Sequence, residues 1–170
     1  MAEIKVIISD VDGVLTDGGM IYHSDGTESK KFSVYDGGGT ALAEKAGLDI
    51  VAMSGEEAPL IGERCRKMGI EDVRLGVKNK LKESYNIKSK YGIENKEVIV
   101  ISDFINDLNI MREFKSACPK SAPELIRSEA DWVVGVKGGE GVLWHVVKEV
   151  LLWQEKFNDA LGRYLKSRAE

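Results

Sequence analysis

Short apolar runs alternate with longer amphipathic or polar stretches along most of the chain. The runs are rich in Val and Ile, which is typical of buried strands in a parallel sheet. We predict strands over 4–8, 49–53, 72–77, 97–101, 115–122 and 131–136. We predict helices over 40–46, 56–68, 79–91, 105–114 and 123–128, and a last helix from 142 to at least 157. This alternation predicts right-handed βαβ units, and therefore an α/β fold with a Rossmann-like parallel sheet flanked by helices.

The segment from about 18 to 39 interrupts this alternation, because it holds no helical pattern. Two strand-like runs, 20–22 and 31–34, flank an Asp25-Gly26 pair. An Asp-Gly pair between such runs predicts a β-hairpin, and the three glycines at 37–39 predict its end. We therefore expect a short hairpin flap within one domain covering 1–170.

The predicted last helix has a wide apolar face. Val142, Val146, Val150, Trp153 and Phe157 recur at helical spacing, and further apolar residues widen the stripe. A well-buried helix and a subunit contact explain this face equally well.

Composition and charge exclude several classes of protein. A length of 170 residues suits one domain with a sizeable core. The net charge of −4, without a long basic run, argues against a nucleic-acid partner. The first apolar run ends at Asp10 and is too short for a signal peptide or membrane span. Cys65 and Cys118 form no CxxC motif, so we expect a cytoplasmic protein with reduced cysteines and no membrane partner.

Two aspartates, Asp10 and Asp12, follow the first predicted strand and precede Gly13. They would lie on one side of an extended strand. Two close carboxylates repel each other unless they share a cation or a proton. An Asp-x-Asp-Gly segment also suits an ordinary turn, so this motif alone favours a turn and a metal site equally.

Polar residues also follow the other predicted strands. In open parallel sheets, ligands bind beyond the carboxyl ends of the strands. The residues that these strand ends and the next helical turns would bring to one edge are Ser54, Gly55, Lys80, Asp103, Asn106 and Asp107. Together with Asp10 and Asp12, they form an ordered set from separate strands.

Phosphoryl transfer is the chemistry that suits this set. A carboxylate can attack phosphorus, and a second acid can protonate the leaving oxygen and later activate water. Magnesium held by oxygen ligands can neutralise the nucleophile and the phosphate. A hydroxyl, a backbone N–H at a helix start and a lysine can bind phosphate oxygens.

Over nearly the whole chain, the sequence resembles the haloacid dehalogenase superfamily of phosphohydrolases. The matching segments are Asp10-Val11-Asp12-Gly13-Val14, Ser54-Gly55, Lys80, and Asp103 to Asp107. The resemblance implies that Asp10 is the nucleophile and Asp12 the general acid and base. It implies phosphate binding by Ser54, Gly55 and Lys80, and Mg²⁺ binding by Asp10, the Asp12 carbonyl and Asp103. Asn106 and Asp107 would support the metal site from nearby.

The capless branch of this superfamily is the more specific resemblance, carried by residues 12–18, the short hairpin and Gly138-Gly139-Glu140-Gly141. This branch includes phosphatases of 3-deoxy-octulosonate 8-phosphate, in lipopolysaccharide biosynthesis, and of nine-carbon ulosonate 9-phosphates, in the synthesis of sialic-acid-type sugars. Its members resemble one another in forming tetramers. Their hairpins build a β-barrel, and a neighbour's C-terminal segment helps to cover the active site. The resemblance therefore implies a homotetramer and a small-molecule sugar-acid phosphate as substrate.

Glu56 stands where the octulosonate enzymes usually have Arg. Glu56, Arg64 and Lys67 are eight and three residues apart, so one helix face can present all three. Similar residues occur in nine-carbon phosphatases, and Arg and Lys can bind a sugar carboxylate. An ordinary solvated helix face is an equally good explanation. We therefore favour the nine-carbon substrate only slightly over the octulosonate.

Several positions depart from the usual motifs of the family. Ser102 and Phe104 replace a glycine and an acid, Asn79 replaces an Asp, and Trp144-His145 replaces Arg-Glu. These departures keep open a second hypothesis, a catalytically weak homologue that acts as an oligomerisation module of a sugar-activating enzyme. A phospho-receiver switch uses similar residue types, but such modules lack the hairpin insertion.

Overall fold

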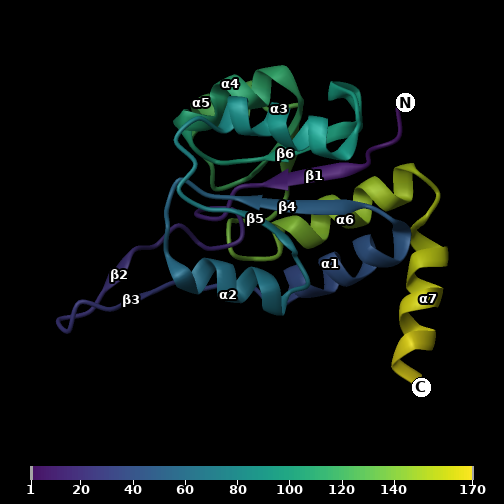
Figure 1. Cartoon of the computed structure of the whole chain (residues 1–170), viewed down its shortest axis with the longest axis horizontal. Coiled ribbons are helices and arrows are strands. Elements are labelled where there is room, and N and C mark those ends of the chain that lie inside the picture. Colours follow the sequence, from purple (N-terminus) through teal and green to yellow (C-terminus); the bar gives the residue numbers. More distant parts are fainter. Residues whose placement is uncertain (1, 170) are drawn as a thin grey trace.

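A six-stranded parallel sheet forms the centre of the computed structural model, which describes residues 2–169 (Figure 1). The strands are ordered β5-β4-β1-β6-β7-β8, and every neighbouring pair is parallel. Their bounds are β1 Val6–Ser9, β4 Asp49–Met53, β5 Asp72–Arg74, β6 Val98–Ile101, β7 Lys115–Pro119 and β8 Trp132–Val134. The predicted α/β fold with a Rossmann-like sheet is confirmed.

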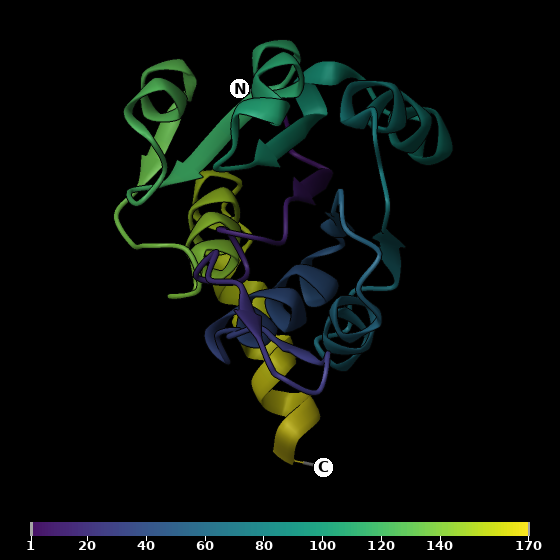
Figure 2. The ribbon, with the colours of Figure 1, turned by 90° about the vertical axis from the view of Figure 1, so that its left-hand side faces the viewer.

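Helices cover both faces of the sheet (Figures 1 and 2). One face carries α1 (Tyr35–Ala46), α2 (Pro59–Lys67) and α6 (Val142–Trp153), and α7 (Phe157–Ala169) packs on α1. The other face carries α3 (Lys80–Tyr91), α4 (Leu108–Glu113) and α5 (Glu124–Glu129). Two short 3₁₀ helices are η1 (Asn95–Glu97) and η2 (Ile105–Asp107). None of the helices in residues 2–169 has the length and apolar character needed to cross a membrane.

The central strand β1 is apolar on both sides because both sides are buried. Ile7 packs into the core beneath α1, α2 and α6, whereas Val6 and Ile8 pack into the core beneath α3 and α4. Each isoleucine buried in this way contributes about 1.5–3 kcal/mol to the free energy of unfolding. Both cysteines, Cys65 and Cys118, are buried and free.

The order of the strands opens a crevice at one edge of the sheet. From β1 the chain passes to β4 and β5 on one side, and it then crosses back to β6 on the other side of β1. Segments that leave neighbouring strands in opposite directions create the usual ligand crevice of open α/β sheets. The carboxyl ends of β1, β4 and β6 therefore define the place to look for a site.

The predicted hairpin is present, but its second arm differs. Strand β2 (Ile21–Tyr22) pairs antiparallel with β3 (Glu28–Ser29), and the hairpin projects from the body of the molecule (Figure 1). The predicted arm over 31–34 is wrong, because Phe32 instead forms an isolated bridge with Thr16. The hairpin therefore closes sooner after its turn than the sequence indicated.

Helix α1 begins at Tyr35, so the prediction that the glycines at 37–39 end the flap is wrong. Glycine costs about 1 kcal/mol inside a helix, but here packing requires it. A Cβ atom on Gly39 would lie 2.9 Å from the Cα atom of Trp144 in α6. The absence of a side chain at this position allows α1 and α6 to approach closely.

The predicted continuous last helix is also wrong, because α6 ends at Trp153 and α7 begins at Phe157. Between them Glu155 adopts a φ of 56°, in the left-handed region. The N–H of Lys156 donates to the Leu151 carbonyl at 2.8 Å and so closes the end of α6. No glycine marks this stop, so the sequence pattern gave no signal for it.

Asp36 links α1 to α6 from a buried position. Its Oδ1 accepts the backbone N–H of Trp144 at 3.1 Å, whereas its Oδ2 is buried and has no hydrogen-bond partner in the part of the chain that the structure describes. Burial raises the pKa of Asp36 from 3.8 to about 6. Because folding raises this pKa, the folded state binds more protons than the unfolded chain between the two values. The free energy of unfolding therefore falls as pH rises through that window.

We expect Asp36→Asn to raise the free energy of unfolding at pH 8 by about 1–3 kcal/mol and to change it little at pH 4. The amide keeps the acceptor for the Trp144 N–H and removes the buried charge. Urea denaturation of metal-free protein at both pH values measures the effect. Asp159→Asn, at an exposed position in α7, is the matched control. An equal change at both pH values in Asp36→Asn would show that charge is not the cause.

Candidate active site

A pocket of about 750 Å³ lies at the carboxyl ends of β1, β4 and β6. Most of the predicted site residues line it, although they come from separate parts of the sequence. These residues are Asp10, Asp12, Ser54, Gly55, Glu56, Lys80, Asp103 and Asn106. The structure therefore brings the predicted strand-end residues together.

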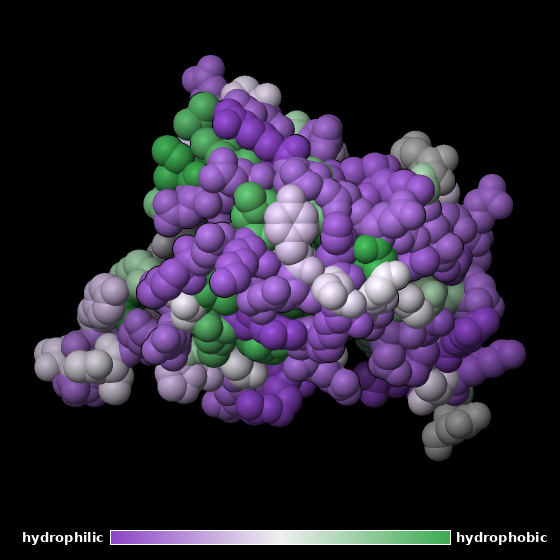
Figure 3. Space-filling view, turned by 45° about the horizontal axis from the view of Figure 1, so that its top comes forward, coloured by the Kyte–Doolittle hydropathy of each residue, from purple (hydrophilic) through white to green (hydrophobic). Residues whose placement is uncertain are grey.

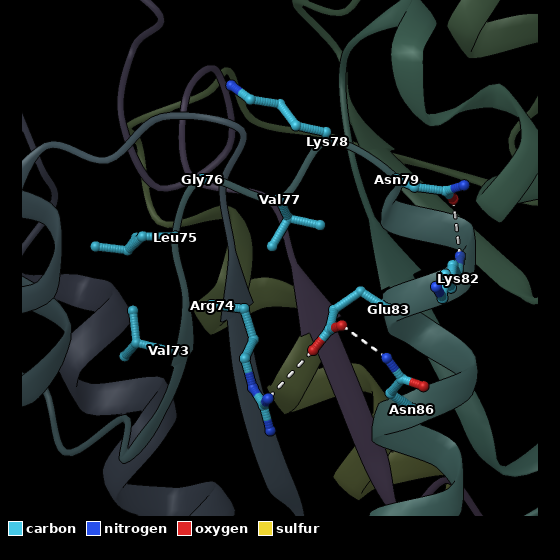
Figure 4. A pocket seen from close by; sticks show the side chains of 10 residues that line it. All are labelled: Val73, Arg74, Leu75, Gly76, Val77, Lys78, Asn79, Lys82, Glu83 and Asn86. Carbon is cyan, nitrogen blue, oxygen red and sulfur yellow. Dashed lines mark hydrogen bonds and ion pairs between the residues drawn. The ribbon is translucent and has the colours of Figure 1, made fainter.

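A second pocket, of about 520 Å³, is lined by residues of β5, of α3 and of the segment that joins them (Figure 4). Val77 and Lys78 line both pockets. In the second pocket Arg74 binds Glu83 at 3.1 Å, and Glu83 accepts a hydrogen bond from Asn86 at 2.9 Å (Figure 4). Its lining includes none of the predicted catalytic aspartates, so the first pocket is the candidate active site.

Asp10 directly follows β1, and hydrogen bonds fix both its backbone and its side chain. Its N–H donates to the Ile101 carbonyl of β6 at 2.8 Å. Its Oδ1 accepts the Val11 N–H at 2.8 Å and lies 2.9 Å from Nζ of Lys80. Lys80 also lies 2.7 Å from Oδ2 of Asp107. Lys80 is therefore held between two carboxylates, one of which is the predicted nucleophile.

Burial dominates the electrostatics of this group. It raises the pKa of Asp10 from 3.8 to about 7, against the opposing effect of Lys80 and with a further increase from Asp107. Burial lowers the pKa of Lys80, but Asp10 and Asp107 outweigh it, so that the pKa lies above its usual 10.5. Lys80 is thus charged at neutral pH, whereas full ionisation of Asp10 requires more positive charge than Lys80 supplies.

Asp103 follows β6 and lies against the glycine of the Asp-x-Asp-Gly segment. A Cβ atom on Gly13, whose φ is 80°, would lie 1.9 Å from Oδ2 of Asp103. Oδ1 of Asp103 is buried and has no hydrogen-bond partner among residues 2–169. Burial first, and then repulsion by Asp107, raise the pKa of Asp103 to about 6. Glycine at position 13 therefore lets the loop after β1 approach the Asp103 carboxyl group. Burial and Asp107 disfavour the ionised form of that group.

A divalent cation with oxygen ligands fits these residues. Asp10 and Asp107 both contact Lys80, and Asp103 lies close enough for Asp107 and Lys80 to shift its pKa. The three acids leave an excess of negative charge around Lys80 when all are ionised. Among residues 2–169, no group of three His, Cys, Asp or Glu side chains is arranged as metal ligands. The predicted set needs only two such side chains, because the third ligand is the Asp12 carbonyl. Carboxylates and carbonyls are the ligands that magnesium prefers.

Asp12 binds a residue that sequence reasoning missed. Nζ of Lys30 lies 2.8 Å from Oδ1 of Asp12 and 2.8 Å from Oε2 of Glu56. The Lys30 side chain is only 1% exposed. Lys30 lies 18 residues from Asp12 and 26 from Glu56, and a lysine beside a predicted hairpin arm carries no sequence signal for this contact.

Ser54 follows β4, is buried and lines the pocket. Its N–H donates to the Arg74 carbonyl at 2.8 Å, and its carbonyl accepts the Val77 N–H at 3.0 Å. Its Oγ accepts the Glu56 N–H at 3.1 Å. The hydroxyl can still donate its own hydrogen to a phosphate oxygen.

The predicted trio of Glu56, Arg64 and Lys67 is not assembled on one helix face. Glu56 lies before α2, which begins at Pro59, and it lines the candidate active site. Arg64 donates to the Ser33 carbonyl at 2.9 Å, and Lys67 pairs with Glu63 at 2.7 Å. Arg64 and Lys67 line a different pocket. The shared-face prediction is therefore wrong, because the helix starts after Glu56.

Two of the departures from the family motifs, Asn79 and Ser102, make hydrogen bonds here. Oδ1 of Asn79 accepts the Lys82 N–H at 2.9 Å and caps α3. The Ser102 hydroxyl donates to Oδ2 of Asp107. Phe104 lines the pocket and is 53% exposed. None of these residues displaces Asp10, Asp12, Ser54 or Lys80 from the pocket.

Comparisons with known proteins agree with this geometry, although no protein-family model matches the chain. The 3-deoxy-D-manno-octulosonate 8-phosphate phosphatase KdsC of Escherichia coli (strain K12) is 32% identical over 161 residues, which cover 94% of this chain and 86% of the relative. The crystal structure of a phosphatase of the same name from Moraxella catarrhalis contains magnesium, phosphate and KDO. It is 30% identical, with a TM-score of 0.90 and coverage of 95% and 93% of the two chains.

A third similar protein extends the likeness to the superfamily. It is a Legionella pneumophila protein described as a HAD superfamily (subfamily III A) hydrolase. Its structure has a TM-score of 0.92 and 29% identity, and the match covers 96% of this chain and 90% of that one. Fold, site geometry and sequence identity thus agree over almost the full length. The chain belongs to the 3-deoxy-D-manno-octulosonate 8-phosphate phosphatase family of the haloacid dehalogenase superfamily.

Proposed function

We propose that this protein is a magnesium-dependent phosphatase that hydrolyses a 3-deoxy-2-ulosonate phosphate through an aspartyl-phosphate on Asp10. One observation carries the proposal. The buried Asp10 carboxylate lies 2.9 Å from the Lys80 ammonium, in a pocket that also contains Asp12, Ser54 and Asp103. This arrangement offers a nucleophile, an acid and base, a phosphate-binding hydroxyl and a further acid within one cavity.

The proposed reaction has two halves. In the first, the Asp10 carboxylate attacks phosphorus, the bond from phosphorus to the sugar oxygen breaks, and Asp12 gives its proton to that oxygen. In the second, water attacks phosphorus and loses a proton to Asp12. The bond from phosphorus to Asp10 then breaks, and inorganic phosphate leaves. Ser54 and Lys80 stabilise the phosphate oxygens through hydrogen bonds and charge.

Asp10, Asp103 and the Asp12 carbonyl would hold the magnesium. When bound, it supplies the positive charge that lets an anionic carboxylate approach an anionic phosphate. The raised pKa values of Asp10, to about 7, and of Asp103, to about 6, support this assignment. The Moraxella catarrhalis relative was crystallised with magnesium.

Two substrates of the proposed class have support. The names of the relatives favour 3-deoxy-D-manno-octulosonate 8-phosphate. Glu56 in the pocket, where the octulosonate enzymes usually have Arg, favours a nine-carbon 9-phosphate. Arg64 and Lys67 line another pocket of the same chain, which removes part of the reason for the nine-carbon substrate. We therefore place the octulosonate first and the nine-carbon substrate second.

A cytoplasmic homotetramer is the proposed assembly. Met20, Ile21 and Tyr22 of the hairpin are large hydrophobic residues with exposed side chains, which supports a contact with another subunit. Figure 3 shows a mostly hydrophilic face, with hydrophobic residues gathered toward its left-hand side. The carboxyl ends of the strands and the hairpin lie on that side in Figure 1.

A panel of phosphate esters with excess magnesium tests the proposed function. It contains the octulosonate 8-phosphate, two nine-carbon ulosonate 9-phosphates and glucose 6-phosphate. We expect kcat/KM for one ulosonate phosphate to exceed that for glucose 6-phosphate by about 100-fold or more, because specific polar contacts discriminate strongly. The alternative, a catalytically weak oligomerisation module, predicts no phosphate release above background from any ester.

A further inference from the structure

Lys30 joins three segments at the edge of the candidate active site. It follows β3 at the end of the hairpin, and its ammonium binds Asp12 after β1 and Glu56 after β4, each at 2.8 Å. The third neighbour of Nζ is Sδ of Met20, at 3.6 Å. The Lys30 ammonium therefore connects the hairpin to the loops that follow β1 and β4.

The burial of Lys30 sets this contact apart from an ordinary surface ion pair. The Lys30 side chain is 1% exposed, whereas those of Asp12 and Glu56 are 27% and 42% exposed. A lysine ammonium is costly to bury unless acceptors replace its lost hydration. Two carboxylates do so here, and the ammonium in turn holds the Asp12 carboxylate in one orientation.

The contact with Lys30 orients the Asp12 carboxylate. Lys30 and the Thr16 hydroxyl, at 2.8 and 3.4 Å, both bind Oδ1 of Asp12. Oδ2 is therefore the oxygen through which Asp12 would exchange a proton with the leaving group. A carboxylate on a loop without such an anchor would sample several rotamers, and catalysis depends on its orientation.

We propose that Lys30 is a positioning residue that fixes Asp12 as the acid of the phosphoryl-transfer step and couples it to the hairpin. This inference rests on the proposed function, because that proposal assigns the acid role to Asp12. Lys30 is not among the residues that line the pocket, so it acts through Asp12 and not on the substrate.

Leaving-group dependence separates this role from general structural support. A sugar alkoxide needs a proton to leave, whereas p-nitrophenolate leaves without one. Because kcat/KM covers the steps from free enzyme and substrate to loss of the leaving group, it contains the contribution of the acid. We expect Lys30→Met to lower kcat/KM for 3-deoxy-D-manno-octulosonate 8-phosphate by about 10- to 100-fold. The value for p-nitrophenyl phosphate should change by less than about threefold.

Two further variants complete the series. Lys30→Arg keeps the charge and the donors, so it should restore at least part of the lost kcat/KM. Lys31→Met alters the adjacent exposed lysine and should leave both substrates unaffected. If Lys30→Met does not fold, Lys30→Gln, which also removes the charge but keeps a hydrogen-bond donor, gives the same comparison.

The outcomes distinguish this inference from the function on which it rests. Equal losses on the two substrates, or no loss on either, would overturn the role of Lys30 while the wild-type activity stands. Wild-type protein that hydrolyses neither ester would overturn the proposed function, and this role of Lys30 with it. A loss confined to the sugar phosphate and rescued by Lys30→Arg supports the inference.

Discussion

Asp10→Asn should lower kcat for the ulosonate phosphate by on the order of 10⁴-fold or more, because an amide cannot replace the attacking carboxylate. The fold should persist, since the Asn carbonyl oxygen can still accept the Val11 N–H that Asp10 accepts at 2.8 Å. Phosphate release at saturating substrate and magnesium measures kcat. Circular dichroism of the same samples checks the fold.

The stability of Asp10→Asn provides an independent test of the cost of the Asp10 charge. Burial raises the pKa of Asp10 to about 7, so at pH 8 the folded protein without metal contains a costly buried charge. Removing that charge should leave the variant at least as stable as wild type in metal-free buffer at pH 8. Asp159→Asn, at an exposed position in α7, should keep full activity. Turnover by Asp10→Asn near the wild-type rate would rule out Asp10 as the nucleophile.

Asp103→Asn should weaken magnesium binding by about 100-fold or more, since removing a direct ligand should cost at least as much as removing an outer-shell partner. Asp103 is assigned as a ligand because its buried Oδ1 has no hydrogen-bond partner within the described residues and lies beside Gly13. Isothermal titration with magnesium chloride measures the affinity directly. In thermal unfolding, magnesium should stabilise wild type by RT ln(1 + [Mg²⁺]/Kd) and Asp103→Asn much less.

Two comparisons make the Asp103 result specific. Asp159→Asn should bind magnesium like the wild type, because Asp159 is not among the residues that line the pocket. Asp103→Asn without metal should be no less stable than wild type at pH 8, because burial and Asp107 raise the pKa of Asp103 to about 6. Unchanged magnesium affinity in Asp103→Asn would remove Asp103 from the set of ligands.

The central strands were predictable because they are buried on both faces. A segment such as Val98–Ile101 must be apolar throughout to pack beneath helices on either side. The start of α1 was not predictable from local pattern. Glycines at 37–39 usually indicate a turn, and they are helical here because α1 packs against Trp144 of α6. Such a contact between distant segments has no local sequence signature.

The residues of the candidate site also divide into those that could be predicted from the sequence and those that could not. Asp10, Ser54 and Asp103 were predictable because parallel strands deliver their carboxyl ends to one edge of the sheet. Lys30 was not predictable, because the path of the hairpin brings it to Asp12 across 18 residues. Its partner Glu56 was identified, but in the wrong local structure.

The false grouping of Glu56 with Arg64 and Lys67 has a local cause. Spacing predicts a shared face only if the helix is already formed at the first residue, and α2 begins at Pro59. Proline fits the first position of a helix, where its missing N–H costs nothing. Treating Pro59 as the start of α2 would have placed Glu56 in the preceding loop, where it faces the pocket.

Release of inorganic phosphate from 3-deoxy-D-manno-octulosonate 8-phosphate, the first substrate of the panel, is the most direct test of the central claim. Wild-type protein should release phosphate through many turnovers with magnesium, and EDTA should stop the release, because the Asp10 and Asp103 carboxylates need the metal charge. No release with magnesium from this ester or from the nine-carbon 9-phosphates would contradict the claim. Equal release with magnesium and with EDTA would contradict its dependence on a metal.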